Sequence, residues 1–407
     1  MELIYNRKLI SKILPLLKTR DIIVIHGARQ VGKSSLIRYF INHHINENYF
    51  YMDLENLEYL DLCNKGPEAV FKFLIGKGLN AKERIILLID EIQYLKKPSN
   101  FLKIFHDHYE NIKLIVSGSS SFDIKRKFKE SLVGRTINFE LFPLDFEEFL
   151  EFKGKKYILK KENPSEINTE LIGLFEEYNS FGGYPKIVLE KNEENKKLML
   201  SQIISTYIKK DIRDLGNIRN IESFNRLVVI LASQSGNLLN VVELSNTLGI
   251  DQKTIKEWIF LLEATYIIKL VRPYHKNIRS ELTKNPKIFF IDTGLMHLLH
   301  LKNFPKTIIG SSLENSIFSE LLKNEAELNF WRTTNKQEID FIVLKGKMIA
   351  IEVKLNFQQS ITSSLNFFKE KYHSRNFVVA LYGNKDKKFK KYPWEMICEI
   401  KSPFNSG

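Results

Sequence analysis

The fold is decided by the stretch Gly27-Ala28-Arg29-Gln30-Val31-Gly32-Lys33-Ser34, which fits the phosphate-loop pattern G-x-x-x-x-G-K-[ST] in full. An apolar run at residues 21–26 precedes it, and a segment of helical length follows it. Glycines at both ends let the backbone fold around phosphate oxygens with its N–H groups pointing inward. The N-terminus of the following helix adds partial positive charge. We therefore predict a strand–loop–helix unit that binds the phosphates of ATP.

Each residue type in this loop has an expected task. Lys33 should reach the β- and γ-phosphates, and the hydroxyl of Ser34 should ligate Mg²⁺. A glycine-rich turn without a ligand is the alternative, and the strand–loop–helix context argues against it. The predicted ATP-binding residues are Gly27, Ala28, Arg29, Gln30, Val31, Gly32, Lys33, Ser34 and Ser35.

A second apolar run, at residues 85–89, ends in Asp90 and Glu91. Buried carboxylates are costly unless they meet a cation. At the carboxyl end of a parallel strand, Asp90 would hold Mg²⁺ through water and Glu91 would polarise the attacking water. The sequence therefore predicts ATP hydrolysis, with ATP and Mg²⁺ as cofactors.

The remaining pattern indicates several domains. The first 150 or so residues alternate strand-like and helix-like segments, which is typical of a parallel α/β sheet. Later segments read as helices, then as three helices with two strands, and finally as a smaller α/β region. We expect an ATPase core at 1–163, a helical lid at 164–222, a helix-rich domain at 223–304 and a last domain at 305–407.

Bulk composition limits the class of protein. The chain has 407 residues with 43% hydrophobic and 27% charged side chains, which fits a soluble globular protein. No apolar run approaches the roughly 20 residues of a membrane span, and the N-terminus lacks the features of a signal peptide. The two cysteines, Cys63 and Cys398, lie far apart and fit a reducing cytoplasm. A net charge of +13 permits an anionic partner such as nucleic acid, although many basic proteins have none.

The order of these motifs resembles archaeal and bacterial AAA+ ATPases, STAND-like in part, that carry a winged helix and a C-terminal PD-(D/E)XK nuclease-like domain. The resemblance covers nearly the whole chain. It implies a P-loop NTPase parallel sheet, a helical lid, a winged helix and a C-terminal α/β domain. Besides the loop and Asp90-Glu91, it rests on Asp53-Leu54-Glu55, Gly118-Ser119-Ser120, Gly134-Arg135, Gly182-Gly183-Tyr184-Pro185, residues 286–294, Glu338-Ile339-Asp340 and Glu352-Val353-Lys354.

The resemblance also implies roles for single residues. It places a polar contact to the γ-phosphate at Ser119, with Ser117 as the alternative. It gives Arg135 a contact to the transferring phosphoryl group, for which a structural salt bridge is the alternative. The triplet ending in Pro185 resembles the element that approaches the adenine base in STAND-type ATPases, and a plain helix break is the alternative. Such ATPases form assemblies, so a homo-oligomer is expected.

Residues 240–266 read as a helix, a turn at Gly249 and a second helix that Asp251 would cap. In a DNA-reading version of this motif the second helix enters the major groove with its N-terminal residues. Those residues are Gln252, Lys253, Thr254 and Lys256, of which Lys253, Thr254 and Lys256 are the predicted DNA contacts. Winged helices in the resembled ATPases also serve as lids or interaction modules, so a protein partner stays open.

The last region contains a second candidate site. Runs at 341–344 and 347–353 look like a hairpin around Gly346, which would place Asp340 close to opposite Glu352. Lys354 would face the same side as Glu352, and Glu314 on the preceding helix could approach them. Such a group can hold a divalent metal and position water for phosphodiester attack, although a salt-bridged remnant would have the same sequence.

These observations leave three functional hypotheses. The leading one is an ATP-driven switch or remodeller that acts on a macromolecule, with DNA as the first candidate. The alternatives are an ATP-gated, metal-dependent nuclease and a STAND-like scaffold for protein assembly. The expected partners are ATP, DNA or other proteins, and further copies of the chain; no membrane partner is expected.

Overall fold

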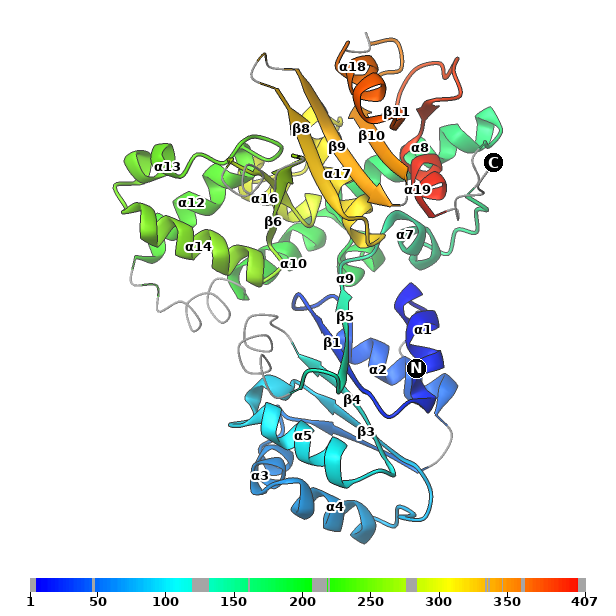
Figure 1. Ribbon diagram of the computed structural model, residues 1–407, viewed down its shortest axis with the longest axis vertical. Helices are drawn as coiled ribbons and strands as arrows, with labels where there is room; N and C mark the ends of the chain where they lie inside the picture. The colour runs from blue at the N-terminus through cyan, green and yellow to red at the C-terminus, as the bar shows by residue number, and fades with distance from the viewer. Residues whose placement is uncertain are drawn as a thin grey trace. The chain divides into compact units, whose positions relative to one another are not determined.

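The protein is represented by a computed structural model that describes residues 5–45, 48–118, 132–159, 162–206, 218, 220–275, 284–333, 335, 337–345, 347–359 and 363–401. The chain divides into two compact units, Met1–Phe142 and Pro143–Gly407 (Figure 1). The first unit thus ends at residue 142, whereas the sequence predicts a first boundary after residue 163.

The N-terminal unit is a parallel α/β sheet, as predicted. Its strands lie in the order β2–β3–β4–β1–β5. The strands are β1 (Ile22–Gly27), β2 (Tyr49–Asp53), β3 (Ile85–Asp90), β4 (Ile112–Gly118) and β5 (Thr136–Leu141). All residues of β1 and β4 are buried, because helices cover both faces of the central strands.

Helices on the two faces of this sheet bury alternate residues of each strand. On one face, α3 (Leu57–Lys65), α4 (Pro67–Gly76) and α5 (Pro98–His108) form a core with residues such as Val24 and Leu87. Helix α2 (Lys33–His44) lies on the other side (Figure 1). The short helices α1 (Lys8–Ile13) and η1 (Leu14–Lys18) precede β1, and η2 (Ile92–Tyr94) follows β3.

The carboxyl ends of all five strands share one edge of the sheet. Asp53 lies opposite Asp90 between β2 and β3, and Ser117 lies opposite Ile25 between β4 and β1. Strand β1 has β4 and β5 as neighbours, whereas β2, which follows it in the sequence, lies on the far side of β3. Such a reversal of strand order leaves a crevice at the carboxyl edge, where ligands of open α/β sheets bind.

The C-terminal unit contains a mixed seven-stranded sheet in the order β12–β11–β10–β9–β8–β6–β7. Its strands are β6 (Ile268–Pro273), β7 (Lys287–Phe290), β8 (Leu328–Arg332), β9 (Glu338–Lys345), β10 (Lys347–Val353), β11 (Arg375–Val379) and β12 (Lys390–Lys391). The helices before β7 are α7 (Phe146–Phe152), α8 (Ser165–Phe181), α9 (Pro185–Leu189), α10 (Glu193–Thr206), α12 (Ile221–Ser233), α13 (Val241–Leu248) and α14 (Gln252–Ala264). Those after it are α16 (Thr293–Leu301), α17 (Gly310–Lys323), α18 (Ser363–Tyr372) and α19 (Pro393–Lys401).

The regions 223–304 and 305–407, which sequence analysis separated, share this sheet. Strand β6 pairs antiparallel with β7 and parallel with β8, where Arg272 lies opposite Asn329. Helix α17 connects the regions further, because its polar residues are buried and bonded to other elements. Asn315 accepts a hydrogen bond from Ser235 (2.6 Å), and Glu320 accepts one from Tyr178 (2.6 Å). These contacts explain why residues 143–407 form one compact unit.

Asp292 is the N-cap of α16, which begins at Thr293. The Asp292 carboxylate accepts from the backbone N–H of Leu295 (3.0 Å) and of Gly183 (2.7 Å). A Cβ atom on Gly182 would lie 2.2 Å from Asp292 Oδ1, so only glycine fits there. In the described part of the chain, no helix has both the length and the apolar character needed to span a bilayer.

Candidate nucleotide-binding site

The phosphate loop connects β1 to α2 at the carboxyl edge of the N-terminal sheet. Its first residue, Gly27, approaches β5 so closely that an added Cβ would lie 2.1 Å from the carbonyl oxygen of Leu141. Gly32, the N-cap of α2, has a left-handed backbone with φ of 97°, and Gln30 has φ of 60°. The two glycines are therefore required for close packing and for the turn into the helix.

Lys33 points back over the loop. Its side chain is buried, and its ammonium donates to the carbonyl oxygens of Ala28 (2.7 Å) and Gly27 (3.2 Å). A phosphate group would offer this cation a charged partner in place of two backbone carbonyls. Of the other predicted contacts, Ala28 and Val31 are buried, Arg29 and Ser34 are half-buried, and Gln30 and Ser35 are exposed.

Asp90 is held at the end of β3 by three donors. Its carboxylate accepts from the hydroxyl of Ser117, from the hydroxyl of Tyr51 (3.2 Å) and from the backbone N–H of Glu91 (3.0 Å). Burial and the charge of Asp90 raise the pKa of Tyr51. No motif in the sequence marks Tyr51, because its contact with Asp90 depends on the pairing of β2 with β3. Together with Ser34, Asp90 offers the oxygen ligands that Mg²⁺ prefers, so these residues fit the expected ion.

Glu91 follows at the N-cap of η2 in a left-handed conformation, with φ of 56° and ψ of 45°. The side-chain amide of Gln93 donates to Glu91 Oε2. This contact fixes the carboxylate at the edge where the loop lies. Ser119, the residue predicted to contact the γ-phosphate, lies outside the described residues, and the alternative Ser117 is bonded to Asp90.

Arg7 contacts the phosphate loop although it lies 24 residues before its contact there, Val31. Its buried guanidinium donates to the carbonyl oxygen of Val31 (2.9 Å) and to that of Phe142 (2.8 Å). It therefore joins the loop to the last residue of the N-terminal unit. No sequence signal marks an arginine with this task, because the contact forms only when β5 lies beside β1.

Arg135 lies at the opposite edge of the same sheet. It precedes β5, and its carbonyl oxygen accepts from the N–H of Ile22 (2.8 Å) at the start of β1. Six residue steps of about 3.3 Å separate this point from Leu141 beside the loop, roughly 20 Å, which an arginine side chain does not span. Arg135 therefore does not act on the nucleotide of its own chain.

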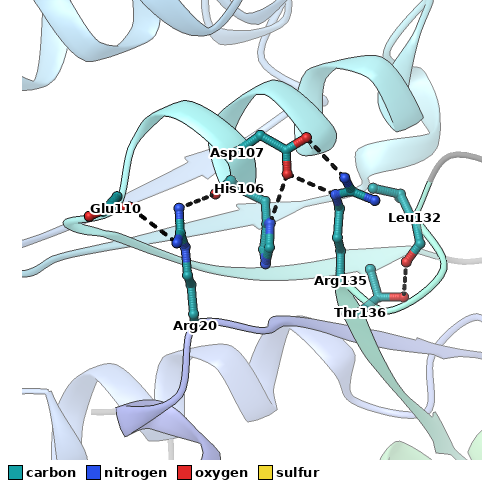
Figure 2. A network of polar contacts seen from close by, with 7 residues as sticks. All are labelled: Arg20, His106, Asp107, Glu110, Leu132, Arg135 and Thr136. Atoms are coloured by element: carbon teal, nitrogen blue, oxygen red, sulfur yellow. Dashed lines mark hydrogen bonds and ion pairs between the residues drawn. The ribbon is translucent and has the colours of Figure 1, made fainter.

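The guanidinium of Arg135 is paired with Asp107 on α5, at 2.8 Å from Nε and 3.1 Å from the second nitrogen (Figure 2). His106 also contacts Asp107 (3.1 Å), and the nearby Arg20 pairs with Glu110 (3.2 Å). The hydrogen bonds from Arg135 and then His106 hold the pKa of Asp107 well below its usual range. The alternative of a salt bridge is thus present in the structure.

The predicted C-terminal site is partly assembled. Asp340 and Glu352 each lie one residue beyond the antiparallel pair Phe341–Ile351 of β9 and β10, so both are on the same face of the sheet. The backbone N–H of Val353 donates to the carboxylate of Asp340 (2.7 Å). Glu352 pairs with Lys354 at 2.8 Å. Gly346, at the proposed turn, lies outside the described residues.

Glu314, the remaining member, is bonded to Lys287 on β7 at 3.0 Å. Burial and the charge of Asp340 raise the pKa of Glu314 to about 7, although Lys287 opposes this shift. In the part of the chain that the structure describes, no three Asp, Glu, His or Cys residues are grouped to hold a metal ion.

The predicted DNA-contacting residues begin α14. Asp251 caps this helix as predicted, accepting from the N–H of Thr254 (2.9 Å) and also from its hydroxyl (2.6 Å). Lys253 and Lys256 are exposed, whereas the hydroxyl of Thr254 is engaged in the cap. Pro185, predicted to approach the adenine, begins α9 in the C-terminal unit.

Family models match three consecutive segments of the chain. An AAA domain model matches residues 19–150, and two domains of unknown function, DUF8612 and DUF4143, match residues 172–307 and 309–400. An uncharacterized protein of Haemophilus influenzae is 26% identical over 86% of both chains. One of Methanocaldococcus jannaschii is 27% identical over 86% of this chain and 77% of its own. The Walker-type ATPase of Pyrococcus abyssi aligns with 73% of this chain and 96% of its own, at 16% identity and a TM-score of 0.46.

The loop, the acidic end of β3 and the strand order define the N-terminal unit as an AAA-type P-loop ATPase domain. Residues 19–150 thus form an AAA domain, and residues 309–400 match DUF4143, a domain of unknown function.

Proposed function

We propose that the chain binds ATP with Mg²⁺ in the loop at residues 27–34 and hydrolyses it. The conversion of bound ATP to ADP would drive its action on a macromolecule. The observation that carries this proposal is the set of polar groups at one edge of the N-terminal sheet. Asp90 and Ser117 end neighbouring strands there, next to the strand that enters the loop. Glu91 follows Asp90 with its carboxylate bonded to Gln93.

Each of these residues has a definite task in hydrolysis. Lys33 would exchange the carbonyl oxygens of Gly27 and Ala28 for the β- and γ-phosphates. Ser34 and Asp90 would hold Mg²⁺, which supplies charge neutralisation at the phosphate oxygens. Glu91 would orient and polarise the attacking water as a general base.

DNA is the first candidate for the macromolecule. Helices α12, α13 and α14 followed by the pair β6–β7 have the element order of a winged helix. Lys253 and Lys256 are exposed near the start of α14, where a recognition helix contacts DNA. Their charges would contribute binding that is mostly independent of sequence and sensitive to salt.

A protein partner is the second candidate, and one observation favours it. Val242 on α13 is 52% exposed and Phe260 on α14 is 55% exposed. Contiguous apolar patches of several hundred Å² mark protein contacts, and these two side chains, on helices that contact each other, would contribute to such a patch. In that case the chain would be a scaffold whose assembly is controlled by ATP.

One experiment tests these proposals together. ATP turnover is measured with and without duplex DNA at low and physiological salt. Lys33→Ala should abolish turnover, and Lys253→Glu with Lys256→Glu should weaken DNA binding roughly tenfold or more. The matched control is Lys191→Glu with Lys369→Glu, which makes the same charge change at exposed positions of the C-terminal unit.

Turnover that survives in a folded Lys33→Ala variant would refute the loop at residues 27–34 as the site of hydrolysis. DNA binding that is undetectable at low salt, or equally weakened by the control pair, would favour the protein scaffold.

A further inference from the structure

The C-terminal acidic cluster, defined here as Glu314, Glu338, Asp340 and Glu352, combines residues of α17, β9 and β10. Two of its acids affect each other directly, because the charge of Asp340 helps to raise the pKa of Glu314. Acids whose charges affect one another in this way are costly to keep ionised together unless a cation is present. The question is which cation neutralises them.

Lys287 provides a cation from within the chain. Its side chain is 4% exposed, and its ammonium lies 3.0 Å from Glu314 Oε1 and 2.6 Å from Glu338 Oε1. Burial alone would lower the pKa of Lys287, but the charges of Glu314, Asp340 and Glu338 raise it above its ordinary value. The ammonium therefore stays charged in a place that water hardly reaches.

The other polar groups around the cluster complete its neutralisation. Glu352, itself buried, pairs with Lys354 at 2.8 Å. Asp340 accepts the backbone N–H of Val353 at 2.7 Å. Glu338 has a second cation in Arg332, at 3.5 Å. Every acid of the cluster thus has a protein donor.

We propose that Lys287 is the resident cation of this cluster and that the cluster holds no divalent metal. The observations do not fit a metal site, since the ammonium of Lys287 already binds two of the acids, and Lys354 and a backbone N–H bind the other two. A divalent ion beside Glu314 would also have to displace the ammonium of Lys287 or be repelled by it.

The ion pairs of Lys287 also connect separate elements of the C-terminal unit. Lys287 lies on β7, whereas its partners Glu314 and Glu338 lie on α17 and at the start of β9. One buried charge thus ties the β6–β7 pair to the C-terminal α/β region. The cluster therefore has a structural role, which is to hold these elements of the C-terminal unit together. Phosphodiester cleavage at these residues is not part of the function.

The test measures the melting temperature of the full-length protein without nucleotide, with and without millimolar Mn²⁺. The wild type should show no shift with Mn²⁺, and neither should Asp340→Asn. Lys287→Met keeps the apolar stem and removes the charge, so it should melt several degrees lower. Mn²⁺ should recover part of that loss, because it replaces the missing positive charge.

Two controls keep the result interpretable. Lys269→Met removes a half-exposed lysine from neighbouring β6 and should give neither the loss nor the recovery. Direct Mn²⁺ binding to the wild type, measured by calorimetry, covers the case in which Lys287→Met does not fold. Wild-type binding that Asp340→Asn abolishes would overturn the proposal. It would also be overturned if the loss in Lys287→Met were unchanged by Mn²⁺.

Discussion

Glu91 has a backbone conformation that is uncommon for a residue with a side chain. A left-handed φ of 56° costs roughly 1–2 kcal/mol for a residue other than glycine, and such strain often occurs at functional sites. Here it turns the chain directly after Asp90 and starts η2, where Gln93 reaches the Glu91 carboxylate. The strained position supports Glu91 as the group that activates water.

Glu91→Gln should therefore leave ATP affinity nearly unchanged and lower turnover by about 10²-fold or more, because a general base is lost while size and shape are kept. Nucleotide binding by calorimetry and phosphate release measure the two effects. Glu83→Gln, an exposed acid of the same unit, is the control. Equal turnover in Glu91→Gln and wild type would mean that another group activates the water.

His297 is buried among polar groups of α8, α16 and α17. Its Nδ1 lies 3.1 Å from the carbonyl oxygen of Ser180, and its Nε2 lies 2.8 Å from the hydroxyl of Ser312. Nδ1 must donate to the carbonyl, whereas the single proton of the Ser312 hydroxyl is directed to Asn179 Oδ1 at 2.8 Å. Burial lowers the pKa of His297 to about 4.

This depressed pKa predicts a loss of stability in acid. The unfolded chain takes up a proton below about pH 6.5, whereas the folded chain resists until about pH 4. The contribution of His297 to the free energy of unfolding is thus fully present above about pH 6.5 and declines as the pH falls. Between pH 7.5 and pH 5 it should decrease by about 2 kcal/mol.

Urea unfolding of wild type and His297→Gln at both pH values checks this expectation. The variant should be less stable at pH 7.5 but should lose about 2 kcal/mol less on going to pH 5. Identical pH dependence of stability in the two proteins would show that folding does not lower the pKa of His297.

At the scale of elements, the segment before β1 supports the phosphate loop. Arg7 precedes α1 and donates to Val31 in the loop and to Phe142 beyond β5. A loop held in its bound shape binds its ligand more tightly, because less conformational entropy is lost on binding. Arg7 is thus a positioning residue for the ATP site.

Arg7→Gln should raise the KM for ATP roughly tenfold with a smaller change in kcat, since the loop loses a charged donor but keeps Lys33. Arg7→Lys should recover part of the affinity. Arg20→Gln, which lies in the network of Figure 2, serves as the control. A fall in stability with unchanged KM would make the role of Arg7 purely structural.

At the scale of the whole molecule, the position of Arg135 determines whether it can act on a nucleotide only after the chain assembles with further copies. It lies at the amino edge of the sheet, while the phosphate loop lies at the carboxyl edge. A role in phosphoryl transfer therefore requires the nucleotide of another copy of the chain. The ion pair with Asp107 would have to open for that role.

If Arg135 acts on a neighbouring copy, turnover per chain should rise with protein concentration. Lys33→Ala and Arg135→Ala proteins should each be weakly active alone and should partly recover activity when mixed, because the first supplies Arg135 and the second an intact loop. Replacing the first by the double variant Lys33→Ala, Arg135→Ala should remove the recovery. Turnover that is independent of concentration, without recovery, would leave Arg135 as a structural partner of Asp107.

Local sequence determined the parts of this protein that depend on neighbouring residues. The phosphate loop, the acidic end of β3 and the cap Asp251 lie where the sequence predicts them. Their chemistry is contained in a few consecutive residues: a glycine that permits a turn, an apolar run that forms a buried strand, or a side chain that reaches the N–H groups just after it.

Only the tertiary structure decided which distant residues meet. Arg7 reaches the loop because β5 lies beside β1, and Tyr51 reaches Asp90 because β2 pairs with β3. Lys287 lies among the C-terminal acids because β6 joins the regions before and after residue 304 in one sheet. A lysine 27 residues before Glu314 has no pattern that predicts this contact, since the pairing of strands depends on packing across the whole unit and not on spacing along the chain.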